Sequence, residues 1–171
     1  MTSTDQDHQR HVRVPSREGR LLRVLTDIVE IKLSAAETNG AYLLIEVDTP
    51  PEGGASVLHT HEPQETFYVL DGTYEFGGVE LDGPYAIRAT AGTAVQIPPG
   101  MPHSYKNVGE TPARVLVLLE PPGQMQAFFE ELHGAVQNID PLTAPLTDLP
   151  ALPQTLEIFA KYDVVVLPPA S

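Results

Sequence analysis

Turn signals recur at short intervals through the middle of this 171-residue chain. They are Asn39-Gly40, the run from Pro50 to Gly54, Asp71-Gly72, Asp82-Gly83 and the run from Pro98 to Gly100. Turns spaced about 8 to 12 residues apart, with no helical period between them, are typical of a β-sandwich or β-barrel. A parallel α/β sheet needs helical crossovers that this spacing does not accommodate. We therefore expect an all-β fold.

The runs between these turns predict short strands. Asn39-Gly40 is a strong hairpin signal because both residues tolerate a positive φ, and the run from Ala41 to Val47 follows it as a strand. The pair Gly77-Gly78 is interpreted as the turn of a further hairpin. The continuous apolar run from Ala113 to Leu119 predicts a strand buried on both faces.

Two stretches carry side chains suited to metal binding. His59 and His61 alternate along a predicted strand, so they face the same side, and Glu65 follows after a short turn. A third histidine, His103, comes just after the turn at Pro98 to Gly100. Taken singly, each could be an exposed loop residue. Together, imidazoles and a carboxylate without thiolates favour a borderline transition metal.

Both stretches resemble the two signature motifs of the cupin family. The first reads G-x5-H-x-H-x3-E-x6-G from Gly53 to Gly72, and the second reads G-x5-P-x-G-x2-H-x3-N from Gly92 to Asn107. The resemblance implies a cupin jelly-roll (double-stranded β-helix) barrel. It also implies a single metal ion held by His59, His61, Glu65 and His103.

The spacing of the apolar residues changes after Pro121-Pro122-Gly123. An apolar stripe at helical spacing predicts one short helix and comprises Met125, Phe128, Phe129 and Leu132. The run from Pro153 to Tyr162 predicts a second helix, with Leu156, Phe159 and Ala160 as its buried side. A last strand is expected at 163–167. We therefore divide the chain into a disordered tail (1–12), a barrel (13–120) and an extension of two short helices and a strand packed on the barrel (121–171).

This C-terminal pattern resembles single-domain cupins of the quercetin (flavonol) dioxygenase type. The resemblance implies an oxidoreductase that acts with O2 on a flavonol-like or other enolisable aromatic substrate, with Glu65 accepting the substrate's hydroxyl proton. The metal would be divalent nickel, manganese, iron, cobalt, copper or zinc. Two alternatives stay open: a non-oxidative isomerase, cyclase or lyase acting on a polyketide-type substrate, and a small-molecule-binding cupin without turnover.

Alternation along the strands predicts further pocket residues. Phe67 shares a face with Glu65, and Tyr105 shares one with His103. Tyr42, Leu44, Phe128 and Phe129 are expected to line or close the mouth. Tyr68 points the other way, and the resemblance suggests a role for it in a homodimer. Gln64, Gln96 and Asn107 are candidate partners for the outer nitrogens of the ligating histidines.

Charge and composition limit the classes of molecule that this chain is expected to bind. The chain has 10 lysines and arginines against 23 acidic residues, for a net charge of −13, which argues against nucleic acid or an anionic membrane surface. It has no cysteine, so no disulfide framework or redox thiol is available. The first residues lack the apolar core of a signal peptide, and we expect a cytoplasmic protein with a small-molecule substrate.

Overall fold

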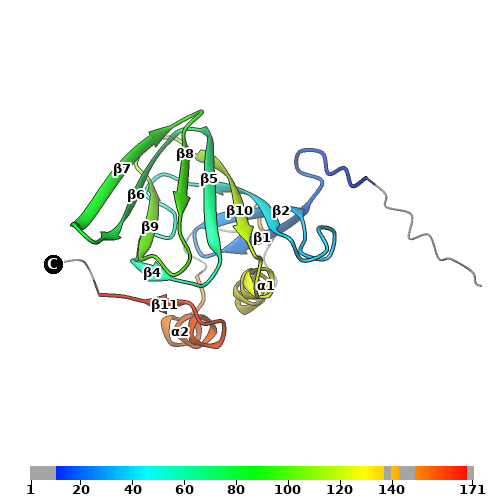
Figure 1. The fold of residues 1–171 in the computed structure, drawn as a ribbon. Helices are drawn as coiled ribbons and strands as arrows, with labels where there is room; N and C mark the ends of the chain where they lie inside the picture. The colour runs from blue at the N-terminus through cyan, green and yellow to red at the C-terminus, as the bar shows by residue number, and fades with distance from the viewer. Residues whose placement is uncertain (1–10, 137–139, 143–148, 169–171) are drawn as a thin grey trace, which may run out of the picture.

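The computed structural model describes residues 11–136, 140–142 and 149–168. Its strands form two sheets that face each other (Figure 1). The first contains, in spatial order, β1 (Arg20–Val24), β2 (Asp27–Leu33), β3 (Leu43–Thr49), β10 (Ala113–Glu120), β5 (Gln64–Asp71) and β8 (Ala94–Ile97). The second contains β11 (Val165–Val166), β4 (His59–Thr60), β9 (His103–Asn107), β6 (Thr73–Glu80) and β7 (Gly83–Thr90). The expected disordered tail falls almost entirely outside the described residues.

Strands that are distant in the sequence lie next to each other in both sheets. β10 pairs with β3 and with β5, and β9 pairs with β4 and with β6, all antiparallel. This exchange of neighbours is the connectivity of a jelly roll. The expected all-β jelly-roll barrel is confirmed.

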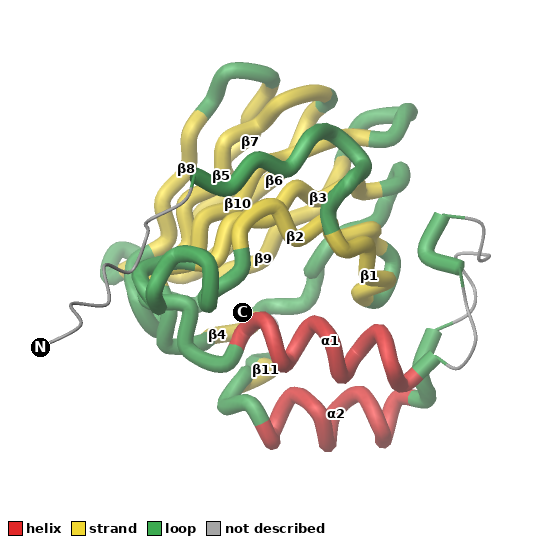
Figure 2. Tube along the Cα trace, turned by 90° about the vertical axis from the view of Figure 1, so that its right-hand side faces the viewer, coloured by secondary structure: helices red, strands yellow, loops and turns green. Residues whose placement is uncertain are grey.

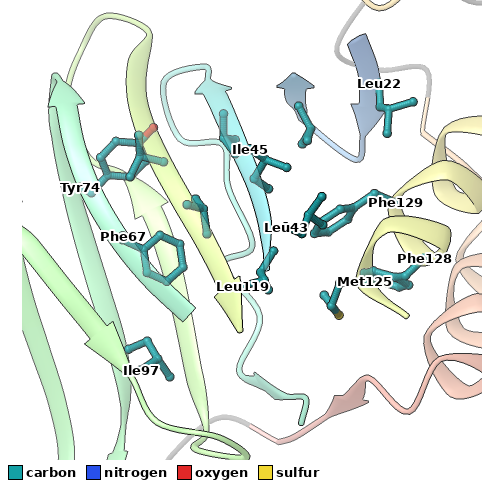
Figure 3. Close-up of a cluster of buried hydrophobic side chains, with 14 of the residues drawn as sticks. Leu22, Leu43, Ile45, Phe67, Tyr74, Ile97, Leu119, Met125, Phe128 and Phe129 are labelled. Carbon is teal, nitrogen blue, oxygen red and sulfur yellow. The ribbon is translucent and has the colours of Figure 1, made fainter. Parts of the chain in front are cut away.

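The barrel core lies between the sheets and continues towards the first helix (Figure 3). β3 and β10 both alternate strictly between buried and half-buried residues. Leu43, Val117 and Leu119 are inward and buried, whereas Leu116 and Leu118 face outward and are half-buried. The prediction that β10 is buried on both faces was therefore wrong, because only one face of the first sheet meets the core.

Two of the predicted glycine turns have different outcomes in the structure. Asn39 and Gly40 adopt φ values of 53° and 76°, which confirms the predicted turn. Gly77 and Gly78, in contrast, lie inside the continuous strand β6, so the hairpin turn predicted there was wrong. A Cβ added at Gly78 would lie 2.5 Å from the carbonyl oxygen of Pro102 and from the ring of Tyr85. This glycine serves a close approach between strands and not a reversal of the chain.

Two helices lie side by side along one end of the barrel (Figure 2). α1 (Met125–Ala135) buries the four apolar residues expected of it. α2 (Leu152–Lys161) begins close to the predicted position, but its buried residues are Thr155 and Ile158. Of the predicted buried side, Leu156 is 45% exposed and Ala160 is exposed, so these two were wrong, whereas Phe159 is partly buried and packs against the core.

The expected last strand is shorter than predicted. β11 pairs with β4 across Val166 and His59, and Leu167 N–H donates to the carbonyl of Leu58. The C-terminal segment therefore borders the strand that carries the first histidine. Among the residues that the structure describes, no helix has the length and apolarity needed to cross a membrane.

Candidate metal centre

Strand pairing brings two of the three histidines opposite each other. His59 on β4 is the register partner of His103 on β9. On its other side, His103 is paired with Gly78 of β6. His61 follows two residues after His59, beyond the end of β4, and is buried. The two motif stretches therefore meet at one end of the second sheet.

The three imidazole rings form a compact group. Ring centroids are 4.4 Å apart for His59 and His103, 4.9 Å for His61 and His103, and 5.8 Å for His59 and His61. One nitrogen from each ring lies within 4.8 Å of the other two. His61 and His103 are buried and His59 is half-buried. A trio of imidazole nitrogens this close together can hold a metal ion.

Glu65 completes the arrangement from the opposite sheet. It lies on β5, is 7% exposed, and directs Oε2 to within 3.1 Å of His103 Nε2 and 3.4 Å of His61 Nε2. Burial alone would raise the pKa of this carboxyl, but hydrogen bonds and charge from His103 and His61 outweigh burial and lower it. Glu65 is therefore held as an anion beside the histidines.

Backbone carbonyls orient two of the rings. His59 Nδ1 lies 2.9 Å from the carbonyl oxygen of Val57, and His103 Nδ1 lies 2.8 Å from that of Met101. A carbonyl accepts a hydrogen bond only from a protonated Nδ1, so the neutral ring of His59 has its lone pair on Nε2. His103 Nε2 donates to Glu65 when it is protonated and offers its lone pair to a metal when it is not. This is the orientation found in metal-ligating histidines, whose outer N–H is held by a neighbouring acceptor.

The side chains expected to orient the histidines have other roles. Asn107 donates to the carbonyls of Thr49 and Thr111 and holds a turn. Gln96 donates to Gln64, and Gln64 in turn donates to Glu120. Those three candidates were wrong. The acceptors are backbone carbonyls, whose positions a sequence pattern does not reveal.

The remaining polar atoms fit a metal ion. His61 Nδ1 is buried and lacks a hydrogen-bond partner among the described residues, and its buried Nε2 has only the 3.4 Å contact with Glu65. A buried polar atom without a partner is unfavourable unless another ligand satisfies it. Burial is the main reason that the pKa of His59 is lowered to about 4, with the neighbouring His103 as the next cause. Its ring is therefore neutral near pH 7, as metal ligation requires.

Two of the expected pocket residues point into the barrel. Phe67 is 1% exposed, and its ring packs 4.9 Å from that of Phe76 and 5.6 Å from that of Tyr105. Tyr105 lies two residues beyond His103 on β9. The barrel interior next to Glu65 along β5 is therefore lined by aromatic rings.

The structure does not bring the other expected pocket residues to the histidines. Leu44 lies on the outward face of β3, opposite Leu118. Tyr42 lines a separate surface hollow with Val12 and Leu33. The described ring contacts of Phe128 are with three other aromatic residues, Phe129, Phe159 and Tyr162, where α1 meets α2.

One buried polar residue near the site was missed in the sequence. Asp27, at the start of β2, is 3% exposed and accepts a hydrogen bond of 2.6 Å from the Tyr105 hydroxyl. In the sequence it reads as an ordinary turn residue after Thr26. The only available signal was the carboxylate itself, placed just before an apolar run.

Comparisons with known proteins agree with this arrangement. Residues 45–119 match the family model described as "Cupin domain". Uncharacterized protein MJ1618 of Methanocaldococcus jannaschii is 33% identical over 73 residues, which make up 42% of this chain. The chain spans only about half the length of that relative, 55%.

Two solved structures share the fold. A predicted oxalate decarboxylase from Thermotoga maritima is 26% identical with a TM-score of 0.56, covering 64% of this chain and 98% of the other. The polyketide cyclase RemF from Streptomyces resistomycificus is 21% identical with a TM-score of 0.56, covering 66% of this chain and 80% of the other. The fold is therefore that of a cupin, and the match over residues 45–119 supports a place for this chain in the cupin superfamily.

Proposed function

We propose that this chain is a metal-dependent enzyme whose centre is formed by His59, His61, His103 and Glu65. The observation that supports this most directly is the convergence of three imidazoles and one carboxylate inside the barrel, with the buried Nδ1 of His61 lacking a hydrogen-bond partner among the described residues. A divalent first-row metal held there would supply Lewis-acid polarisation of a substrate oxygen. The chain's own residues supply binding, orientation and proton transfer.

We assign the chemistry to a dioxygenase acting on a flavonol-like or other enolisable aromatic molecule. Glu65 is the carboxylate that lies against the histidines, so it is the group placed to accept a proton from a substrate hydroxyl. Its contacts with His103 and His61 lower its pKa and make it a weak base. Glu65 therefore becomes an effective base only when Oε2 moves away from those rings.

The lining of the barrel favours a neutral aromatic substrate. Phe67, Phe76 and Tyr105 form one group of rings. Among the buried residues that the structure describes, Arg23 is the one arginine or lysine. Its Nη1 donates to the carbonyl oxygen of Thr26 at 3.2 Å. A dianion such as oxalate, named for the Thermotoga maritima structure, would have to rely on the metal for charge compensation, because Arg23 is already engaged.

The same four side chains would also serve a non-oxidative cyclisation or isomerisation. Polarisation of a carbonyl and proton transfer by Glu65 need no O2. The two reactions therefore differ in one measurable requirement, which is oxygen.

The test begins with metal-free protein reloaded separately with each of the candidate metals. Metal content and oxygen uptake with quercetin are then measured for the wild type and for His59→Ala. We expect one metal per chain and metal-dependent oxygen uptake in the wild type, with both lost in the variant. Metal binding without uptake, but with anaerobic turnover of a polyketide-type substrate, would replace the dioxygenase with the cyclase. Metal binding without either turnover would leave a small-molecule-binding cupin.

A further inference from the structure

A buried carboxyl contacts the aromatic lining of the barrel through the hydroxyl of Tyr105. Asp27 opens β2 and is 3% exposed. Its two oxygens have different partners: Tyr105 Oη donates to Oδ2 at 2.6 Å, and Thr26 Oγ1 donates to Oδ1 at 3.1 Å. Nothing in the proposed reaction uses this carboxyl directly. Its contacts lead instead to the two segments that carry the histidines.

The first contact fixes β9. Tyr105 is two residues beyond His103, so both side chains leave the strand on the same side. The ring of Tyr105 packs against Phe67 and against the backbone of Gly54. A Cβ added at Gly54 would lie 2.6 Å from the Tyr105 carbonyl oxygen and 3.0 Å from its ring. The ring is therefore held at its face by close packing and at its hydroxyl by Asp27.

The second contact fixes the segment that leads to His59. Thr26 Oγ1 accepts a hydrogen bond of 3.0 Å from the backbone N–H of Gly54. The next residue, Ala55, accepts a hydrogen bond of 3.0 Å from the backbone N–H of Tyr105. The chain then reaches His59 four residues later. One carboxyl thus ties together the approach to the first histidine and the strand of the third.

We propose that Asp27 is a positioning residue of the metal centre, which fixes the spacing of His59 and His103 through Thr26 and Tyr105. The inference rests on the metal site proposed above. A carboxyl suits this role because its two oxygens accept hydrogen bonds in diverging directions. Outer partners of this kind set the affinity of a metal site because they hold its ligands in the binding geometry.

Cobalt(II) binding to the metal-free protein tests the proposal without any assay of turnover. Affinity and the visible absorption spectrum of the bound cobalt are compared for the wild type, Tyr105→Phe, Asp27→Ala and Asp27→Asn. We expect Tyr105→Phe and Asp27→Ala to weaken binding by about 10- to 100-fold and to alter the spectrum. Asp27→Asn should lose less, because its amide oxygen still accepts one of the two hydrogen bonds. If Asp27→Ala does not fold, Tyr105→Phe carries the test alone.

Tyr74→Phe is the matched control. Tyr74 is also fully buried, and its ring lies 6.2 Å from that of Tyr105, but no described hydrogen bond joins its hydroxyl to Asp27. Its variant should bind cobalt like the wild type even where its thermal stability falls. Equal weakening in Tyr74→Phe and Tyr105→Phe would overturn the proposal in favour of general loosening of the core.

Two further outcomes separate this inference from the proposed function. Wild-type affinity and an unchanged spectrum in both Tyr105→Phe and Asp27→Ala would overturn the role of Asp27 and leave the metal site intact. A wild-type protein that takes up no cobalt would overturn the metal site, and the positioning role with it.

Discussion

Two buried carboxyls in one barrel have pKa values that are shifted in opposite directions. Glu65 and Asp27 are 7% and 3% exposed, and desolvation raises the pKa of each. For Asp27 desolvation prevails, and its pKa is raised from 3.8 to about 7. For Glu65 the neighbouring groups prevail, and its pKa is lowered. Burial is common to both, so the partners decide the charge.

The partners differ in kind. Glu65 Oε2 lies 3.1 Å from His103 Nε2 and 3.4 Å from His61 Nε2, and an imidazole is a side chain that can carry a positive charge. Asp27 faces the hydroxyls of Tyr105 and Thr26, with the charge of Arg23 as a weaker influence. Neutral hydroxyls lower the pKa of an acid less than an ionisable partner does. The same side-chain chemistry therefore yields an anion at the metal centre and a group that takes up a proton near neutral pH behind it.

The largest expected effect comes from removing the partner of Glu65. His103→Ala deletes one metal ligand and leaves a buried carboxylate with one imidazole fewer. We expect metal binding to be lost and the metal-free protein to be destabilised by about 3–5 kcal/mol, since breaking a buried ion pair leaves an uncompensated charge. Metal content and urea unfolding of the metal-free protein measure the two effects.

A double variant sharpens this test. In His103→Ala with Glu65→Gln the charge has gone, so the double variant should be more stable than His103→Ala alone. A single variant as stable as the wild type would mean that the anion of Glu65 does not depend on His103.

The second effect concerns Asp27 and pH. Because its folded pKa is raised above the unfolded value of 3.8, its contribution to stability is complete below that value and is lost as the pH rises through about 7. The loss amounts to at most about 4 kcal/mol, from about 1.4 kcal/mol per unit. Asp27→Asn does not titrate, so relative to the wild type it should gain stability over this range. Unfolding free energies measured across the range test this, and parallel curves for the two proteins would contradict the raised pKa.

The sequence predicted which four side chains converge and missed the carboxyl of Asp27. His59, His61, Glu65 and His103 were identifiable because strand alternation and fixed motif spacing place them together within two short stretches. Asp27 was not, because its main partner, Tyr105, lies 78 residues away and the contact depends on how the two sheets close. That the four ligands bind a metal stays a prediction.

The other errors have the same origin. Helical spacing in α2 predicts a buried stripe with Leu156 and Phe159. The structure packs Phe159 against the core but buries Thr155 and Ile158 and leaves Leu156 exposed. Periodicity specifies which residues share a face, but not which face meets a neighbour. Gly78 was interpreted as a turn because its need for space depends on Pro102 and Tyr85, which are close only in the folded chain.

The smallest effect is expected for a third carboxylate, which lies on the surface and provides the reference for the other two. Glu130 on α1 forms a salt bridge of 2.5 Å with Arg20 on β1. The Glu130 side chain is 30% exposed and the Arg20 side chain is 60% exposed. Water already solvates both charges, so Glu130→Gln should change stability by less than about 1 kcal/mol. Salt should reduce even that difference, because exposed charges are screened. Urea unfolding at low and high salt measures both, with cobalt(II) affinity expected to be unchanged. If Glu130→Gln lost as much unfolding free energy as His103→Ala, burial of the carboxylate would not determine how much stability its ion pair contributes. The contrast between Glu65 and Asp27 would then need another cause.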